Sequence, residues 1–385
     1  DAYFLLIIIE LNMKKIAIVT ASFAPISTPR ANRATELAKE FAKQGCLVTV
    51  YNCTSVVDGT FNINENIRVV DLNIRKASIM KSSTKNNVTY TILDKGIILI
   101  RKLVYYFFLG SWLLYLFGLK KKLRFDDKYD LLISIGLPFT IHWGVSLRIH
   151  GHNIARCYVA DYGDPFSRGN DNLKCAKYFQ WIEKKVIDKF DYITIPTYNA
   201  IDSYTWLKSS DCIKVIPQGF NFSEVKTLDY VPNKIPTFIY AGIFYSDIRN
   251  PKNLFDILLK LDFDFCFIIY TVKGLQDSYS CIKPYIDKLG SKLVIYDSIP
   301  RLALIEKLSV ADFLINMSNT SANQIPSKLI DYALSHRPIY SCTPNSIDLD
   351  KLISFCKGDY TGSENINLRD YDITTIVNSF FSLMQ

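Results

Sequence analysis

Several well-known functional motifs are missing from this sequence of 385 residues. No Gly-x-Gly-x-x-Gly string follows the first predicted strand, which disfavours a dinucleotide oxidoreductase, and neither a P-loop nor a Gly-x-Ser-x-Gly string occurs. The nine Cys residues form no Cys-x-x-Cys pair and only four His accompany them, so neither a disulfide scaffold nor a zinc site is expected. The thiols are therefore predicted to be buried and reduced, as in a cytoplasmic protein.

The composition suits a folded protein with two domains of ordinary size. Apolar residues make up 49% of the chain and aromatic residues 14%, which is enough for two packed cores. The net charge of +8 comes from Lys and Arg residues spread along the chain, with one local run at Lys120–Lys122 followed by Arg124. An anionic membrane surface or a phosphorylated substrate explains this pattern better than nucleic acid does.

The first twelve residues are predicted to be an extension without function. Residues 2–11 are apolar but too short to span a bilayer, and they lack the basic flank and the cleavage site of a signal peptide. We expect the natural start at Met13, because the next residues read as the opening strand of an α/β domain.

Apolar strand-like runs alternate with amphipathic helix-length runs, which predicts parallel sheets covered by helices on both faces. A helix is expected over 31–44, closed by Gly45. The first sheet is predicted to hold 16–20, 47–51, 67–72, 131–135, 156–160, 192–196 and 214–216. The second is predicted to hold 237–241, 265–271, 292–296, 313–316 and 338–341.

One aromatic segment departs from this alternation. Residues 103–119 carry no charge and are flanked by Arg101-Lys102 and Lys120–Lys122. Their length lies at the lower limit for a membrane span, and a span here would split the first sheet. We therefore expect segment 96–122 to lie in the membrane interface, with its aromatic rings inserted and its lysines on anionic headgroups. A wholly buried helix pair is the alternative.

The segment 311–339 carries the most chemical information. An apolar strand is followed by a predicted helix that begins near Ser327, whose hydroxyl caps free N–H groups, and Lys328 comes next. A phosphate placed there would meet the N–H donors, the positive helix end and the Lys together. Asp331 lies one turn later on the same face, where its carboxylate can accept bonds from ribose hydroxyls. The pattern favours a nucleotide-sugar site over an ordinary capped helix with an ion pair.

Further candidate binding residues follow another strand of the second sheet. Gly242 ends the run 237–241 and allows close backbone approach to a ligand. Arg249, in the loop before the next predicted helix, can bind a diphosphate through two parallel hydrogen bonds.

Two polar segments follow strands of the first sheet, at the edge where α/β sheets bind ligands. One contains His142, which can hydrogen-bond a donor or acceptor, and the other contains Asp164, which can orient or deprotonate an acceptor hydroxyl. From the residues alone, a turn around Gly163 and a helix cap at His142 are the simpler interpretation.

At these segments the sequence resembles the GT-B glycosyltransferases, specifically the bacterial family 4-like group that builds surface polysaccharides. That group has a Pro-Ser-Lys-Leu-x-Glu-Tyr string before a Lys-Pro-Ile/Val strand, and here the Glu is Asp331. Its Glu-x7-Glu pair, which handles donor sugar and ribose, corresponds by spacing to Asn323 and Asp331. Residues 217–221 resemble its Pro-Asn-Gly-Phe/Val-Asp segment, where the chain leaves the first domain.

The resemblance continues in the first domain, with departures. Relatives show Gly-Pro-Pro-His-Ser-x-His and Ala-Asp-Phe-Arg-Asp-Pro-Trp strings, in which His142 matches the second His and Asp164 the second Asp. Phe139 replaces the first His and Gly163 replaces the Arg. In the second domain Ile243 stands where the family commonly has a basic residue.

The resemblance implies two Rossmann-like domains facing a cleft, with a C-terminal helix crossing back to the first domain. The expected boundaries are 13–221 for the acceptor domain, 222–236 for a linker, 237–365 for the nucleotide-sugar domain and 366–385 for the crossing helix. The implied enzyme is cytoplasmic and peripheral on the inner face of the cell membrane. It would transfer a sugar from a nucleoside diphosphate donor to a lipid-linked saccharide, with retention of configuration. The resemblance implies no metal or other cofactor.

Each candidate residue has an implied role. Catalysis would involve Asp164 and His142, while donor binding would involve Gly242, Arg249, Asn323, Ser327, Lys328 and Asp331. Two alternatives stay open. A sugar-nucleotide 2-epimerase of the same fold needs no lipid, and a non-catalytic nucleotide-sugar-binding subunit would fit the departures at Phe139, Ile243 and Asn323.

Overall fold

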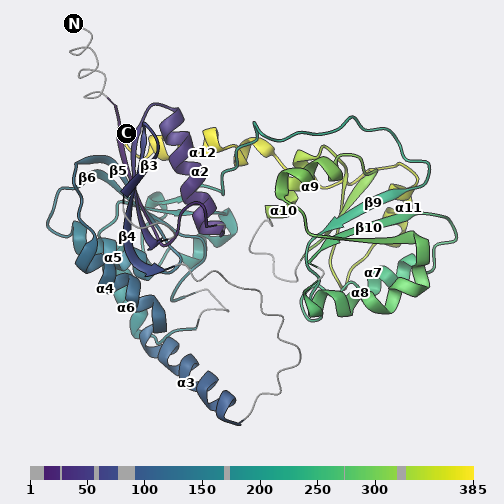
Figure 1. Ribbon diagram of the computed structural model, residues 1–385, viewed down its shortest axis with the longest axis horizontal. Coiled ribbons are helices and arrows are strands. Elements are labelled where there is room, and N and C mark those ends of the chain that lie inside the picture. The colour runs from purple at the N-terminus through teal and green to yellow at the C-terminus, as the bar shows by residue number, and fades with distance from the viewer. Residues whose placement is uncertain are drawn as a thin grey trace, which may run out of the picture. The chain divides into compact units, whose positions relative to one another are not determined.

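The computed structural model describes residues 13–26, 28–55, 60–76, 92–168, 174–272, 274–318 and 327–385. The chain divides into two compact units, one running to Phe220 and including Asp372–Gln385, and the other comprising Asn221–Tyr371 (Figure 1). Each unit has a parallel sheet covered by helices on both faces, so the predicted pair of Rossmann-like domains is confirmed. The expected extension 1–12 lies outside the described residues.

The first sheet has the strand order β3-β4-β2-β1-β5-β6-β7-β8. Its strands are β1 (Lys15–Thr20), β2 (Leu47–Ser55), β3 (Thr60–Asn64), β4 (Ile67–Lys76), β5 (Tyr129–Ile135), β6 (Ala155–Asp161), β7 (Tyr192–Ile195) and β8 (Ile213–Val215). The seven predicted strands are all present. The prediction missed β3, an edge strand antiparallel to β4, because its five residues include only two apolar ones and give a weak alternating signal.

Two helix layers cover this sheet (Figure 1). Strand β1 is buried on both faces: Ile16 and Ile18 pack toward α2 and α12, and Ala17 and Val19 toward α4, α5 and α6. The first layer comprises α2 (Pro29–Lys43) and α12 (Ile373–Ser382), and the second comprises α4 (Leu113–Lys122), α5 (Thr140–Ile149) and α6 (Tyr178–Ile187). Because α12 packs on α2 within the first unit, the predicted crossing of the C-terminal helix is confirmed.

Helix α2 begins and ends as the residue types dictate. Thr28 caps its start by accepting a hydrogen bond from the Ala31 N–H at 3.3 Å, and Pro29 occupies the first helical position, where its missing N–H is harmless. At the other end Gly45 has a φ of +83°, the left-handed conformation that closes a helix, as predicted.

The predicted interfacial segment forms two helices. α3 (Ile92–Phe108) ends at Leu109, which is left-handed with a φ of +57°, and a short 3-10 turn at Gly110–Trp112 leads into α4. Among the described residues no single helix is long and apolar enough to cross a membrane, although the pair Leu99–Phe108 and Gly110–Lys122, bent by 41°, meets those criteria jointly. In Figure 1 α3 projects away from the sheet of its own unit.

The aromatic rings of this segment divide into two groups. Tyr115 is buried and Trp112 packs edge-on against Tyr105 at 5.3 Å, so protein covers these rings. Phe108 and Phe117 remain 61% and 62% exposed. The alternative of a wholly buried helix pair is therefore wrong.

The second sheet has the order β11-β10-β9-β12-β13, with every pairing parallel. Its strands are β9 (Thr237–Ala241), β10 (Cys266–Thr271), β11 (Leu293–Asp297), β12 (Phe313–Met317) and β13 (Ile339–Cys342), all of them predicted. Helices α7 (Lys252–Leu258), α8 (Gln276–Leu289) and α11 (Leu349–Cys356) cover one face, while α9 (Arg301–Leu308) and α10 (Ser327–Leu334) cover the other.

The segment predicted as a linker, 222–236, lies along the second unit. Asp312, just before β12, accepts hydrogen bonds from the Tyr230 hydroxyl at 2.7 Å and from the Asn233 N–H at 3.1 Å. The Arg337 guanidinium stacks over the Tyr230 ring at 3.3 Å. These contacts fix the path of the segment on its unit.

Close packing between α4 and α5 generates a prediction. A Cβ atom at Gly144 would lie 2.6 Å from Leu119 Cδ1 and 2.7 Å from Leu119 Cβ. Gly144→Ala gains about 1 kcal/mol of helix propensity, but forcing the helices apart costs more, in the range of ~1–3 kcal/mol. We expect a net loss of stability of about 1 kcal/mol, measured by urea unfolding.

Gly96→Ala in α3 is the matched control, because nothing lies within 4 Å of a Cβ at that position. Only the propensity gain acts there, so the free energy of unfolding should stay equal or rise. Changes of the same sign at Gly96 and Gly144 would contradict the packing argument.

Candidate functional site

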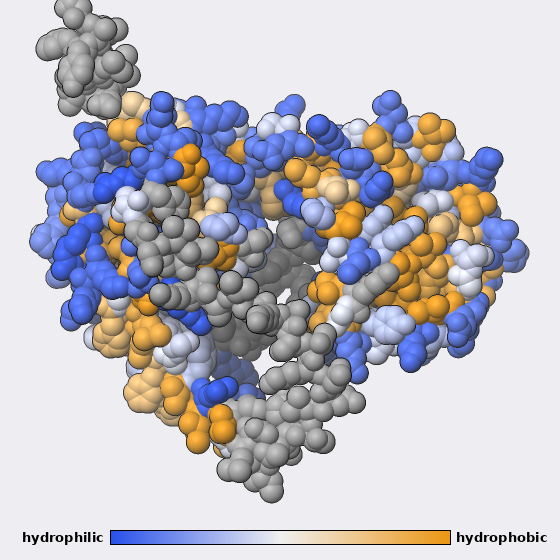
Figure 2. All heavy atoms as spheres, viewed as in Figure 1, coloured by the Kyte–Doolittle hydropathy of each residue, from blue (hydrophilic) through white to orange (hydrophobic). Residues whose placement is uncertain are grey.

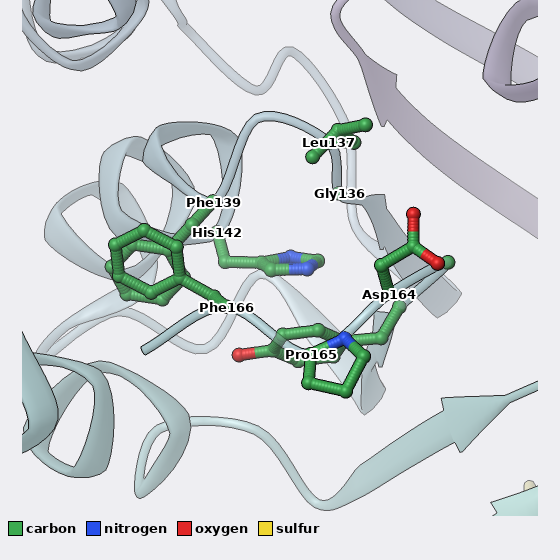
Figure 3. Close-up of a pocket in the computed structure, with 9 residues that line it drawn as sticks. Gly136, Leu137, Phe139, His142, Asp164, Pro165 and Phe166 are labelled. Atoms are coloured by element: carbon green, nitrogen blue, oxygen red, sulfur yellow. The ribbon is translucent and has the colours of Figure 1, made fainter. Parts of the chain in front are cut away.

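A small pocket opens at the carboxyl edge of the first sheet, where the chain leaves β5 and β6 (Figure 3). It brings together the two predicted catalytic residues, His142 and Asp164. In Figure 3 the His142 ring lies between Asp164 on one side and the stacked rings of Phe139 and Phe166 on the other. The pocket is lined by Gly136, Leu137, Phe139, His142, Tyr162, Gly163, Asp164, Pro165 and Phe166.

His142 is held in one orientation and is neutral. Its side chain is fully buried, and its Nδ1 shares a 2.8 Å hydrogen bond with Ser134 Oγ on β5. Burial lowers the pKa of His142 to about 3, a net value that includes an increase due to Asp161 and a smaller decrease due to the Arg30 cation. Its Nε2 has no hydrogen-bond partner among the described residues, so it can donate to or accept from a ligand hydroxyl.

The backbone of the turn after β5 approaches this ring closely. A Cβ at Gly136 would lie 2.4 Å from His142 Nε2, so only glycine fits there without moving the ring. Phe139, which replaces the family's first His, stacks on Phe166 with ring centroids 4.3 Å apart. An aromatic wall thus stands where the resemblance suggested a polar side chain.

Sequence reasoning missed the buried ion pair behind the pocket. Asp161, the last residue of β6, accepts hydrogen bonds from Arg33 Nε at 2.7 Å and Nη2 at 2.6 Å, and from Thr194 Oγ1 at 2.6 Å. Burial opposes its ionisation, but the Arg33 and Arg30 cations and these bonds hold the pKa of Asp161 below its usual value. Asp161 is therefore ionised, and its role is structural, because it binds the Arg33 side chain of α2.

A second buried acid, Glu183, holds the loop that follows β6 and lines the pocket. Glu183 on α6 accepts a hydrogen bond from the Tyr162 hydroxyl at 2.9 Å and one from the Ser167 N–H at 3.1 Å. Burial raises the pKa of Glu183 to about 7, although the bonds from Ser167 and Tyr162 favour its charged form. These contacts fix both ends of the loop that carries Asp164.

In the second unit three predicted donor-binding residues lie together after β9 and at the start of α10. A Cβ at Gly242 would lie 3.2 Å from Lys328 Nζ, and Gly242 has a φ of +146°, which other residues rarely adopt. Lys328 Nζ lies 4.4 Å from the centre of the Tyr240 ring. Arg249 donates a 3.2 Å hydrogen bond to the Ile243 carbonyl.

The charge state of Lys328 is unusual. Burial and, to a smaller extent, the neighbouring Arg249 cation lower the pKa of its amine to about 7. The two cations therefore repel each other, and an anion bound between them would relieve this repulsion. A diphosphate suits this arrangement. It can pair with both cations, approach the backbone at Gly242 and lie at the start of α10.

The remaining predicted donor residues have mixed outcomes. Asp331 accepts a 2.6 Å hydrogen bond from Arg301 Nε on α9, a partner that the sequence analysis did not anticipate. Burial raises the pKa of Asp331 above its usual value, although the Arg301 cation and its hydrogen bond act to lower it. Ser327 is the first residue of α10, as predicted, and Asn323 lies outside the described residues.

The second cluster lies where the strand order of its sheet reverses, between β9 and β12. The first pocket lies at the carboxyl ends of β5 and β6, and β5 borders the reversal between β1 and β5. At such a point the helices diverge to opposite faces and leave room for a ligand at the carboxyl ends of the strands. Among the described residues no group of three or more His, Cys, Asp or Glu side chains could hold a metal ion.

Comparison with known proteins identifies the fold. No family model matches the sequence, and no curated protein matches it either. Among solved structures, a glycosyltransferase from Rickettsia africae ESF-5 has a TM-score of 0.61 at 10% identity, covering 97% of this chain and 98% of that chain.

Two further structures agree with this result. The lipopolysaccharide outer core galactosyltransferase WaaB has a TM-score of 0.58 at 14% identity, covering 96% of this chain and 99% of that one. Anabaena HepE in complex with UDP has a TM-score of 0.55 at 11% identity, with coverage of 96% and 99%. The chain has the GT-B fold of these glycosyltransferases.

The depressed pKa of Lys328 generates a prediction about nucleoside diphosphate binding. Below pH 7 the amine is already charged; above pH 7 it must take up a proton when the diphosphate binds. The affinity for a nucleoside diphosphate should therefore fall as the pH rises from 7 to 9, approaching tenfold per pH unit. Calorimetry in two buffers of different ionisation enthalpy would measure the proton uptake directly.

Lys328→Met should weaken binding of the nucleoside diphosphate by ~1.5–3 kcal/mol and abolish this proton uptake. The control is Lys252→Met, because Lys252 is exposed and pairs with Asp256 instead. An affinity that does not change with pH in the parent protein would contradict the role of Lys328.

Proposed function

We propose that this protein is a glycosyltransferase that moves a sugar from a nucleoside diphosphate sugar to a lipid-linked saccharide during surface polysaccharide assembly. The observation that carries the proposal is the cluster of Lys328, Arg249 and Gly242 at the switch point of the second sheet. Two cations that repel each other beside an open backbone turn are suited to a diphosphate. HepE, whose structure has the same fold, was solved with UDP.

The donor is held by the second unit in this proposal. Lys328 and Arg249 bind the diphosphate and stabilise the charge that develops as it leaves. Asp331, oriented by Arg301, accepts hydrogen bonds from the ribose hydroxyls, while Asn323 binds the donor sugar and Ser327 caps the helix start. The cations and the helix end supply the stabilisation, so the proposed reaction uses no metal or other cofactor.

The acceptor is handled by the first unit. Neutral His142 hydrogen-bonds a hydroxyl through Nε2, and Asp164 on the other side of the pocket orients or deprotonates the acceptor hydroxyl (Figure 3). The resemblance to the family 4-like group supports transfer of a hexose with retention of configuration.

Asp164→Asn tests this assignment, because it keeps the shape of the side chain and removes its charge. We expect transfer to fall at least ~100-fold, the lower bound for losing a positioned acid or base, with UDP binding unchanged. The assay incubates the protein and a lipid-linked saccharide with a panel of nucleotide sugars and identifies the products by mass spectrometry.

The control is Asp127→Asn, because Asp127 is 44% exposed and pairs with Lys15 away from the pocket. A variant at 164 that transfers sugar at the parent rate would refute the role of Asp164. Formation of an epimerised nucleotide sugar without transfer would favour the 2-epimerase, and tight donor binding without turnover would favour a non-catalytic subunit.

The α3–α4 surface supports a peripheral membrane location on the inner face of the cell membrane. Figure 2 shows apolar side chains gathered over α3 and α4. Those more than one-third exposed are Ile97, Leu99, Ile100, Leu103, Val104, Tyr106, Phe107, Phe108, Leu114 and Phe117. Exposed basic residues, Arg101, Lys102 and Lys120–Lys122, flank them, so the surface combines apolar insertion with attraction to anionic lipid.

Phe108→Asp combined with Phe117→Asp tests this location, since both rings are exposed and neither contributes to the core. Losing insertion of two Phe rings should lower binding to anionic vesicles at least roughly 100-fold, measured by co-sedimentation. Nucleotide binding and circular dichroism should stay unchanged.

The matched control is Tyr198→Asp with Tyr279→Asp, two exposed rings on other elements. Equal loss of vesicle binding in both double variants would show that any exposed ring suffices, against the proposal. A folded α3–α4 variant that binds vesicles like the parent protein would also exclude it.

A further inference from the structure

A guanidinium group occupies the space above Gly163 in the pocket loop. A Cβ at Gly163 would lie 2.7 Å from Arg30 Cζ and 2.9 Å from Arg30 Nε, distances that no real side chain tolerates. Arg30 comes from the first turn of α2, far away in the sequence, and its side chain is only 17% exposed. Residue 163 immediately precedes Asp164, so the Arg30 cation lies at the rim of the pocket.

Asp161 alone does not neutralise the positive charge of Arg30. Asp161 is already neutralised by two short hydrogen bonds from Arg33, and its distance to Arg30 Nη1 is longer, at 3.5 Å. Two guanidinium cations thus share one carboxylate. Asp164 is the next carboxylate that interacts electrostatically with Arg30, so it supplies the balancing charge.

The placement of Arg30 depends on the absence of a side chain at residue 163. The space beside Gly163 is filled by a guanidinium from another element. A cation is therefore delivered to the pocket loop by a distant part of the chain.

We propose that Arg30 is a positioning residue for Asp164 and supplies the cation at the pocket rim that the glycine at position 163 leaves room for. Arg30 holds the Asp164 carboxylate toward the pocket through its planar, permanently charged group. Helix α2 anchors Arg30, and the contacts of Tyr162 and Ser167 with Glu183 hold the loop that carries Asp164, so both charges are held in place. This inference rests on the proposed function, in which Asp164 acts on the acceptor hydroxyl.

The first experiment measures transfer in a cycle of variants at the two positions. Arg30→Ala should lower kcat roughly 100-fold, the effect of misplacing a reacting group by about 1 Å, and leave the donor KM unchanged. Gly163→Ala should cause a similar loss, because the new Cβ displaces the Arg30 guanidinium. The double variant Arg30→Ala, Gly163→Ala should be no worse than either single variant, since both changes remove the same contact.

Rescue separates a positioning role from a structural one. Gly163→Arg should impair the parent protein but improve kcat at least roughly tenfold when added to Arg30→Ala, because it returns a cation beside Asp164. Arg30→Lys, which keeps the charge without the planar fork, should fall between parent and Arg30→Ala. Arg156→Ala, which removes an arginine whose side chain is 85% exposed, is the control expected to match the parent.

A second experiment needs no substrate. Phenylglyoxal, a reagent for guanidinium groups, should label Arg30 slowly in the parent protein and faster in Gly163→Ala, as followed by peptide mass spectrometry. An unchanged labelling rate would overturn the placement of Arg30, and a parent-like kcat in Arg30→Ala would overturn its role. If the parent protein transfers no sugar from any donor, the proposed function fails with the role that rests on it, whereas the labelling still decides the placement.

Discussion

The buried ion pair between Asp161 and Arg33 determines how the first unit is assembled. Asp161 is fully buried and Arg33 is 3% exposed, and the same guanidinium also donates to the carbonyls of Pro217 at 2.6 Å and Ile216 at 3.1 Å. One pair thus joins α2 to the end of β6 and to the chain segment that leaves the unit. Removing either partner would leave an uncompensated buried charge, at a cost of ~3–5 kcal/mol. The pocket loop begins at the next residue, so its position depends on this pair.

Both candidate sites use the same physical arrangement. Each lies at the carboxyl ends of neighbouring strands, each contains a glycine where an added Cβ would crowd a functional side chain, and in each burial changes the pKa of that side chain. The clearest cases are His142, whose pKa falls to about 3, and Lys328, whose pKa falls to about 7. Burial therefore keeps the His neutral for hydrogen bonding and leaves the Lys able to gain charge when an anion binds.

The strands and helix ends were predictable because their signals are local. Continuous apolar runs such as Ile16–Val19 in β1 leave little choice for a strand buried on both faces, and Gly45 marks the end of α2. The start of α2 was predicted at residue 31, whereas the helix begins at Pro29 behind the Thr28 cap. The break between α3 and α4 was not predictable, because a left-handed Leu109 has no sequence signature. Nor was the division of the aromatic rings between core and surface, which depends on how α4 packs against α5 and β4.

Hydrophobic periodicity and chain order are read along one dimension, so they were enough to predict two parallel-sheet units with polar residues at the carboxyl ends of their strands. Which charged side chains meet depends on the folded arrangement of distant segments. Arg30, Arg33 and Asp161 are brought together across more than a hundred residues, and Arg301 reaches Asp331 from a different helix. Each pair supplies the hydrogen bonds that a buried polar group requires. A polar group requires such a partner only after folding has removed it from water.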